Sequence, residues 1–139
     1  MNKIGAGTLE LTRAAGNTYT GGTFVTAGTL LVNNTSNSGT GTGAISVTGA
    51  TSVLGGSGLA TGTATIGSDA TLNPGGALTA GTLTLGGLTL SSGSLLSYQL
   101  GAIASSDKTA VTGTNLFTAD GGTITLTGLD GLTNGTYNL

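Results

Sequence analysis

Five carboxylates are the side chains of this sequence that could carry acid–base chemistry, because the chain contains no histidine and no cysteine. The lack of both residue types excludes a Ser-His-Asp triad, a thiolate nucleophile, and a metal site built on imidazole or thiolate. The carboxylates are widely spaced: Glu10, Asp69, Asp107, Asp120 and Asp130. A glycosidase needs two carboxyl groups within about 5–10 Å of each other, and the nearest candidates, Asp120 and Asp130, could share one turn edge. Nothing pins that pair together, so we predict no catalytic residue and no enzyme.

Two Asp-Gly dipeptides, Asp120-Gly121 and Asp130-Gly131, could supply weak Ca²⁺ ligands. Asp-Gly is, however, a common turn dipeptide, and the calcium-binding repeat Gly-Gly-x-Gly-x-Asp is absent. The stretch 39–43, Gly-Thr-Gly-Thr-Gly, lacks the Lys-Ser/Thr and the following helix that a phosphate-binding loop needs. We therefore predict turns and corners at these positions, with no cofactor and no metal site, and leave open a weak Ca²⁺ site at Asp120 or Asp130.

Three further features have structural interpretations. The pair Asp107-Lys108 is expected to be solvated on a strand edge. Three tyrosines are too few for an aromatic sugar-binding platform, and Tyr19 is expected to pack at a corner. The Asn-x-Ser/Thr sequons of this Asn- and Thr-rich chain are interpreted as coincidental; they begin at Asn33, Asn34 and Asn134.

The composition excludes several classes of protein. Charged residues make up 6% of the chain, against about 25% in a typical domain. The basic residues Lys3, Arg13 and Lys108 are too few and too scattered to bind nucleic acid or a membrane surface. Abundant Thr, Leu, Val and Ile argue against disorder. No 18-residue apolar run is present, which excludes a transmembrane helix. No small-molecule substrate is indicated.

The sequence shows no helical periodicity. It contains short runs in which apolar and polar residues alternate, and each run is bounded by Gly or Asn. The phrase Gly-Thr-Leu-x-Leu/Val begins at Gly7, Gly28 and Gly81, and looser echoes lie between and after these copies. Repetition at such short, roughly regular intervals is typical of a solenoid. The expected strands are 8–11, 23–26, 29–32, 44–47, 51–54, 63–66, 70–73, 82–85, 88–90, 94–98, 109–112, 123–126 and 136–139.

These patterns predict an all-β fold, a right-handed single-stranded parallel β-helix of about six coils with about 20–25 residues each. Residues 1–139 form one segment, with looser coils over 39–100 and longer turns over 101–139. Inward side chains would stack in apolar ladders while alternating threonines face outward. The inward set includes Leu9, Leu11, Leu30, Val32, Leu83 and Leu85.

Residues 5–34 carry a specific motif. It reads Gly-Thr-Leu-Glu-Leu-Thr from Gly7, then Asn17-Thr-Tyr-Thr-Gly-Gly-Thr23, then Ala27-Gly-Thr-Leu-Leu-Val32. This closely resembles the autotransporter-associated β-strand repeat, also called the passenger-associated transport repeat. The lead-in 13–16 and Phe24 depart from the usual pattern without disturbing the strands. The resemblance implies a passenger-domain β-helix of a type V secreted or similar surface protein, in which the repeat is structural.

Several roles follow as expectations. The first is a structural stalk, spacer or fibre-forming segment at a bacterial surface, and the alternative is an adhesin or glycan-binding module. The expected location is extracellular or on the cell surface, with signal peptide and translocator encoded outside this chain. Neither 5–12 nor 136–139 carries a polar cap, so the ends of the β-helix could associate end to end into fibres.

Overall fold

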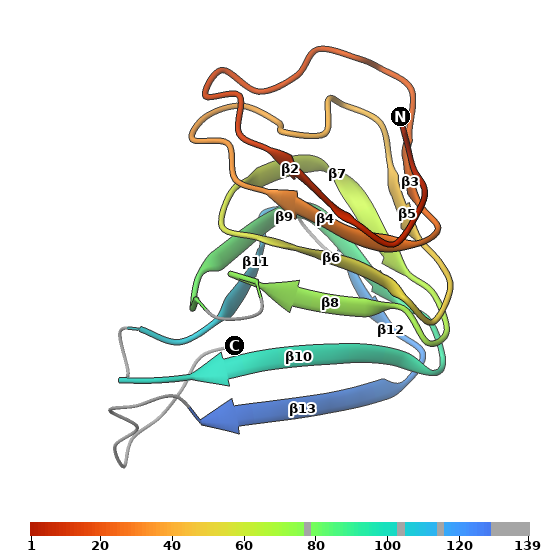
Figure 1. Ribbon diagram of the computed structural model, residues 1–139, viewed down its shortest axis with the longest axis vertical. Helices are drawn as coiled ribbons and strands as arrows, with labels where there is room; N and C mark the ends of the chain where they lie inside the picture. The colour runs from red at the N-terminus through yellow and green to blue at the C-terminus, as the bar shows by residue number, and fades with distance from the viewer. Residues whose placement is uncertain (77–78, 103–104, 114–115, 129–139) are drawn as a thin grey trace.

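The computed structural model describes residues 1–76, 79–102, 105–113 and 116–128. Over these ranges it contains strands and no helix, and the parallel strands stack as a β-solenoid of about five turns (Figure 1). Accordingly, no described segment is a helix with the length and apolar character needed to span a membrane. The predictions that concern Asp130, Asn134 and a strand at 136–139 lie outside the described residues.

The strands form two sheets, and the chain alternates between them. Sheet 1 contains β1 (Asn2–Lys3), β3 (Thr23–Val25), β5 (Ile45–Val47), β7 (Leu59–Ile66), β9 (Thr82–Leu90), β11 (Lys108–Val111) and β12 (Phe117–Ala119). Sheet 2 contains β2 (Thr8–Leu11), β4 (Gly28–Val32), β6 (Ser52–Gly56), β8 (Thr71–Pro74), β10 (Ser94–Leu100) and β13 (Gly122–Gly128).

The coils are unequal in length. A short coil leads from Val53 to its partner Thr71 on the next level, whereas a clearly longer one leads from Leu88 to its partner Phe117. Each sheet has strands at six successive levels of the stack, because β11 and β12 both pair with β9 and share the last level of sheet 1. From the first level to the last, the chain makes about five turns. The predicted all-β parallel solenoid is thus confirmed, with about five turns where the sequence suggested about six coils.

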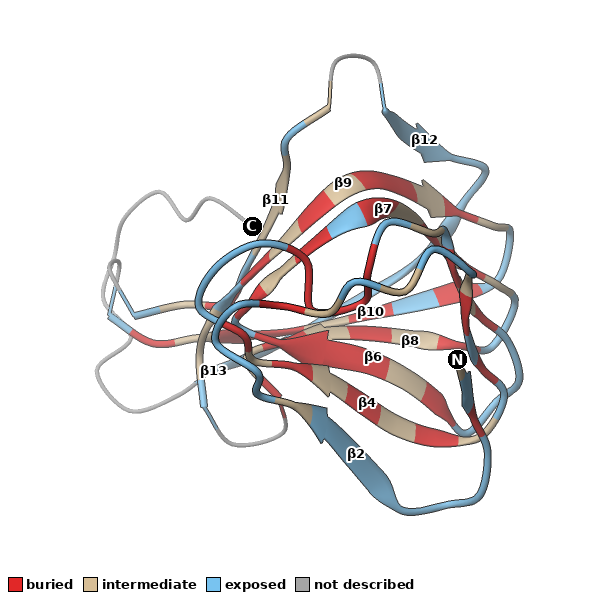
Figure 2. Ribbon diagram, turned by 90° about the horizontal axis from the view of Figure 1, so that it is seen from above, coloured by how far each residue is buried: buried red, intermediate tan, exposed pale blue. Residues whose placement is uncertain are grey.

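Buried and less buried residues alternate along the strands in the middle of the stack (Figure 2), because every second side chain of a strand points to the same face. Leu30, Leu54 and Leu72 are fully buried. They belong to a continuous inward row, here called the leucine row, in which each residue pairs with the next: Leu9, Leu30, Leu54, Leu72, Leu96 and Ile124. Burying one such side chain stabilises the fold by about 1.5–3 kcal/mol, so this row and its counterparts on sheet 1 hold the coils together.

Several strands differ from the sequence-based expectation; β7, for example, begins at Leu59 and not at residue 63. The runs 82–85 and 88–90 form one strand, β9, because Gly86 and Gly87 continue the extended chain between them. The short strands β1 and β12 were not predicted; β1 pairs with β3 and β12 pairs with β9.

Gly56 shows why corners need glycine. Its φ is +104°, a value that residues with a side chain rarely adopt, and an added Cβ would collide with the backbone of Val32 one coil earlier. The close stacking of β4 and β6 therefore depends on this residue.

Candidate functional site

The described carboxylates are spread over the length of the solenoid. Glu10 is exposed on β2 and accepts a hydrogen bond from Asn33 Nδ2 at 2.5 Å. Asp69 is exposed beside the Ser68 hydroxyl, 3.1 Å away, and Asp120 is exposed in the turn between β12 and β13. Within 1–76, 79–102, 105–113 and 116–128, no three His, Cys, Asp or Glu residues gather where they could hold a metal ion. The pairing of Asp120 with Asp130, and the Ca²⁺ site at either, stay predictions because Asp130 lies outside those ranges.

Asp107 is buried, and the expectation that it would be solvated is wrong. Its side chain has no exposed surface, while the neighbouring Lys108 is exposed as expected. The carboxylate accepts hydrogen bonds from the Gly81 N–H at 2.9 Å (Oδ1) and from the Gln99 N–H at 2.7 Å (Oδ2). It therefore ties the corner before β11 to the corner before β9 and to strand β10. The sequence could not show this, because the burial depends on how neighbouring coils stack around the side chain.

Burial raises the pKa of the Asp107 carboxyl above its ordinary value of 3.8, and the two backbone N–H donors partly oppose that rise. Two buried amide oxygens in this part of the solenoid, Asn73 Oδ1 and Gln99 Oε1, have no hydrogen-bond donor among the described residues. Gln99 nevertheless donates through Nε2 to the Gly76 carbonyl at 2.9 Å. Gln99 thus adds a second buried acceptor beside the backbone group that Asp107 binds.

Residues 12–22 of the repeat motif form the connection between β2 and β3. Asn17 donates through Nδ2 to the Gly39 carbonyl of the next coil at 2.7 Å, and its N–H donates to the Ser38 carbonyl at 2.8 Å. The Tyr19 hydroxyl lies 2.9 Å from Thr23 Oγ1, and the Tyr19 carbonyl accepts from the Thr42 N–H at 3.2 Å. Tyr19 therefore lies within the corner, as predicted, and the motif's polar groups join the first coil to the second.

Lys3 is an inward-facing cation in the first strand of sheet 1. It pairs with Val25, whose row continues through Val47, Ile66 and Leu90, and is 6% exposed. Its ammonium donates to the Gly5 carbonyl at 2.6 Å and to the Ala27 carbonyl at 2.8 Å. The sequence pattern indicated an uncapped edge at 5–12 and gave no sign that the charge just upstream of it is buried. Inward charges blunt an open sheet edge.

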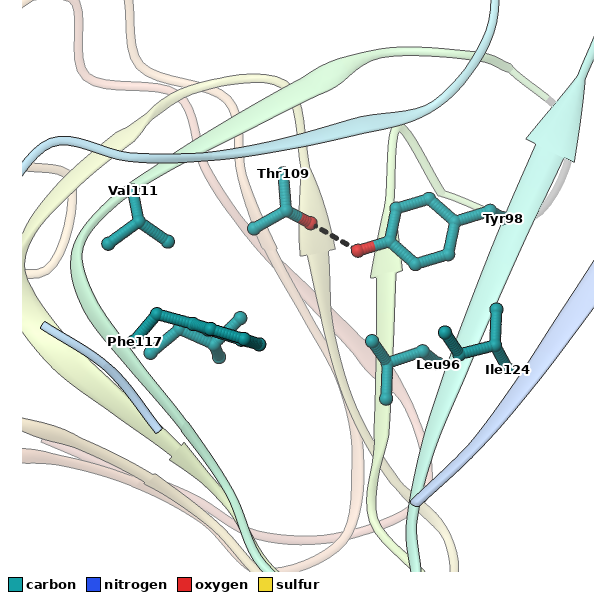
Figure 3. A pocket seen from close by; sticks show the side chains of 7 residues that line it. Leu96, Tyr98, Thr109, Val111, Phe117 and Ile124 are labelled. Carbon is teal, nitrogen blue, oxygen red and sulfur yellow. Dashed lines mark hydrogen bonds between the residues drawn. The ribbon is translucent and has the colours of Figure 1, made fainter. Parts of the chain in front are cut away.

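The last described coils enclose an apolar pocket of about 360 Å³, here called the C-terminal mouth. Figure 3 shows Leu96, Tyr98 and Ile124 on one side and Val111 and Phe117 on the other. The Tyr98 hydroxyl lies 2.7 Å from Thr109 Oγ1, and burial raises the pKa of Tyr98 above 10.0. The mouth is lined by Leu88, Leu96, Tyr98, Thr109, Val111, Phe117 and Ile124.

These side chains make the mouth an apolar recess. It has one hydroxyl pair, no described charge, and walls that are the inward faces of the last strands. Such a lining can cover apolar groups and offers no acid–base pair.

Comparison with known proteins gives one match. No curated protein and no solved structure matches the chain. The motif predicted over 5–34 is confirmed, because residues 1–32, which build the first coil and enter the second, match the family model of the passenger-associated transport repeat.

Proposed function

We propose that this chain is a structural β-solenoid segment, a stalk or spacer, of a secreted or surface-exposed bacterial passenger of autotransporter type. The observation that carries the proposal is the continuity of the stack. The coil built by the repeat motif is followed by coils with the same two-sheet plan, joined through the leucine row. A rod of stacked coils keeps distant parts of a protein at a fixed separation, growing by about 4.8 Å per coil.

The polar contacts between coils support the same role. Asn33 forms hydrogen bonds with residues of two other coils. Its Nδ2 donates to Glu10, and its Oδ1 accepts from the Ser57 N–H at 2.8 Å. Asn34 Oδ1 accepts from the Leu59 N–H at 3.0 Å. Side chains that bond to neighbouring coils stiffen a rod and leave few groups free for chemistry. The glycan-binding alternative stays a prediction.

Surface display of the full chain tests the proposal. The chain is placed between a signal peptide and an outer-membrane translocator, and antibody binding to intact cells is measured. We expect display of the wild type and reduced display of Gly56→Val, which cannot stack β6 on β4. Gly7→Val is the matched control, because an added Cβ there meets no atom within 4 Å.

Two results would count against the proposal. One is equal display of all three chains, which would show that coil stacking does not matter to passage. The other is labelling of the native protein in the cytoplasm only, by immunogold microscopy of the bacterium that produces it.

A further inference from the structure

The two Asp-Gly dipeptides of the sequence join a carboxyl group to a residue that offers little steric barrier to ring closure. In such a pair the backbone nitrogen of the glycine can attack the carboxyl carbon of the aspartate and close a cyclic imide, a succinimide. Glycine favours this because it has no Cβ and its backbone rotates freely. Asp120-Gly121 lies within the described residues, whereas Asp130-Gly131 lies outside them.

The corner that holds Asp120 and Gly121, between β12 and β13, is open to solvent. The φ of Gly121 is +113°, and an added Cβ there would meet no atom within 4 Å. This exposure belongs to the corner and not to the end of the stack, since Asp69 and Gly93, at the corresponding corners of two earlier coils, are exposed as well. Water and space for a ring are therefore available at Asp120.

The nitrogen that would attack is not engaged in the fold. The Gly121 N–H has no hydrogen-bond acceptor among the described residues. Gly93 holds the equivalent position one coil earlier, and its N–H has no described acceptor either, although another coil follows it. The free N–H is thus a property of this corner. Because no hydrogen bond has to break, the peptide group can turn its nitrogen toward the carboxyl carbon.

The other described aspartates are held differently. Asp69 lies in the corner between β7 and β8, but the N–H of the buried residue that follows, Ala70, donates to the Gly67 carbonyl at 3.2 Å. Asp107 is itself buried, and its carboxylate accepts two backbone hydrogen bonds. The N–H of the next residue, Lys108, donates to a backbone carbonyl at 2.9 Å. In both places the nitrogen that would attack is already bonded.

We propose that Asp120 is a site of spontaneous isomerisation, at which isoaspartate forms in the folded protein because the Gly121 N–H is free. The Gly121 nitrogen bonds to the Asp120 carboxyl carbon, and its proton leaves with the carboxyl hydroxyl group as water. Water then opens the ring. Cleavage of the bond from this nitrogen to the original backbone carbonyl carbon leaves isoaspartate, and cleavage of the new bond restores aspartate. One water is released and one is taken up, so no oxidant is needed and the mass is unchanged.

The product fits the corner. Isoaspartate routes the main chain through Cβ and so lengthens it by one carbon atom. The Asp120 N–H donates to the Leu90 carbonyl at 2.9 Å, which fixes the corner on one side. Gly122 pairs with Ser94 in the ladder, which fixes it on the other. Gly121 lies between these two anchors with open space around it and can accommodate the extra atom, so the solenoid should survive the change.

Incubation of the folded full chain, followed by unfolding and digestion with an endoproteinase that cleaves before aspartate but not before isoaspartate, tests the site. We expect cleavage before Asp120 to decline with incubation time, while cleavage before Asp69 and Asp107 persists in the same sample. Electron-transfer fragmentation of the uncleaved peptide should place the isoaspartate at residue 120. Asp120→Glu keeps the charge and should abolish the modification, because a glutamate would have to close a larger ring.

A matched variant separates the geometry from the dipeptide. Ala70→Gly gives Asp69 a following glycine, yet the N–H of residue 70 should still donate to Gly67, so Asp69 should stay unmodified in the folded chain. Circular dichroism before incubation checks that this variant is folded. In urea, where both corners are lost, Asp69 of the variant and Asp120 should isomerise at similar rates.

Two results would overturn the inference. One is cleavage before Asp120 that stays constant in the folded wild type while it declines in urea, which would show that the fold protects the pair. The other is equal modification of Asp120 and of Asp69 in folded Ala70→Gly, which would show that the dipeptide alone sets the rate and the free N–H does not. Neither result bears on the proposed structural role, which surface display measures separately.

Discussion

Individual polar residues hold this solenoid together at its corners. Asn33 contacts the coils before and after its own through Glu10 and the Ser57 N–H, and Asp107 receives two backbone donors inside the fold. A buried backbone N–H that loses its acceptor costs about 1–3 kcal/mol. Few charges are present in this chain, and the buried ones, Lys3 and Asp107, are each bonded to backbone groups.

Substitution of Asp107 by Asn tests this role. An amide offers one acceptor oxygen, so its NH₂ group would face either the Gly81 or the Gln99 N–H. We expect Asp107→Asn to lower the free energy of unfolding near neutral pH by about 1–3 kcal/mol. Urea denaturation followed by circular dichroism measures the change. Lys108→Gln is the control, since the exposed neighbour should shift stability by no more than about 0.5 kcal/mol. Equal effects of the two substitutions would contradict the role.

The free energy of unfolding should depend on pH through the carboxyl group of Asp107. Because burial raises the pKa of Asp107 above 3.8, the native protein holds this proton more tightly than the unfolded chain does. Proton binding therefore adds a stabilising contribution that is fully present below pH 3.8 and is lost as the pH rises through the native pKa, while the two backbone hydrogen bonds to Asp107 remain. Urea unfolding of wild type and Asp107→Asn across about pH 3–7 should show a wild-type advantage that shrinks as the pH rises. An advantage that grows with pH would reverse the sign of the shift.

At the scale of strands, stability comes from inward rows that run through every coil. The leucine row is continuous in sheet 2, whereas the row of sheet 1 that begins at Lys3 is apolar from Val25 onward. Outward rows are mixed, with Thr, Ser, Asn and Gly beside occasional leucines. The period-2 pattern therefore predicts burial well in the middle of the stack, where both neighbouring coils are present.

Leu54 and Val53 are adjacent on β6 and point to opposite faces, which makes them a matched pair. Leu54→Ala leaves a cavity between Leu30 and Leu72 and should cost about 2–5 kcal/mol. Val53→Ala, on the half-exposed outer face, should cost about 1 kcal/mol or less. Chemical denaturation of both variants checks the difference. Similar losses for the two would mean that the inward row does not dominate the stability of the coil.

The match between sequence and strands fails where the signal is short or depends on a neighbour. Strands β4, β5 and β8 lie close to the expected runs because each has alternating apolar residues between Gly or Asn. Strand β1 was not predicted, because its two residues form a strand through their pairing with β3, which no local pattern shows. Leu9 was predicted to be inward, and it pairs within the leucine row, yet it is exposed because no described coil covers it.

The molecule as a whole is a stack in which each coil contacts mainly its neighbours. Stability in such a stack should be greatest in the middle and lowest at the two edges, since edge coils have one neighbour. Hydrogen exchange followed by mass spectrometry should find β6 and β7 the slowest to exchange and β2 and β13 the fastest. The sample should be dilute, so that chains are separate. Uniform protection along the stack at high dilution would contradict this gradient.

The sequence by itself determined the all-β class, the parallel solenoid and the repeat motif, because these depend on local periodicity and on turn residues that recur along the chain. It also located most of the inward rows. The tertiary structure alone decided which polar residues are buried and what the ends present. Asp107 and Lys3 look like surface charges in the sequence, but contacts with neighbouring coils enclose them. The C-terminal mouth likewise exists only because strands far apart in the chain come together around it. Burial and contact depend on the stacking of distant segments, and no local pattern records that.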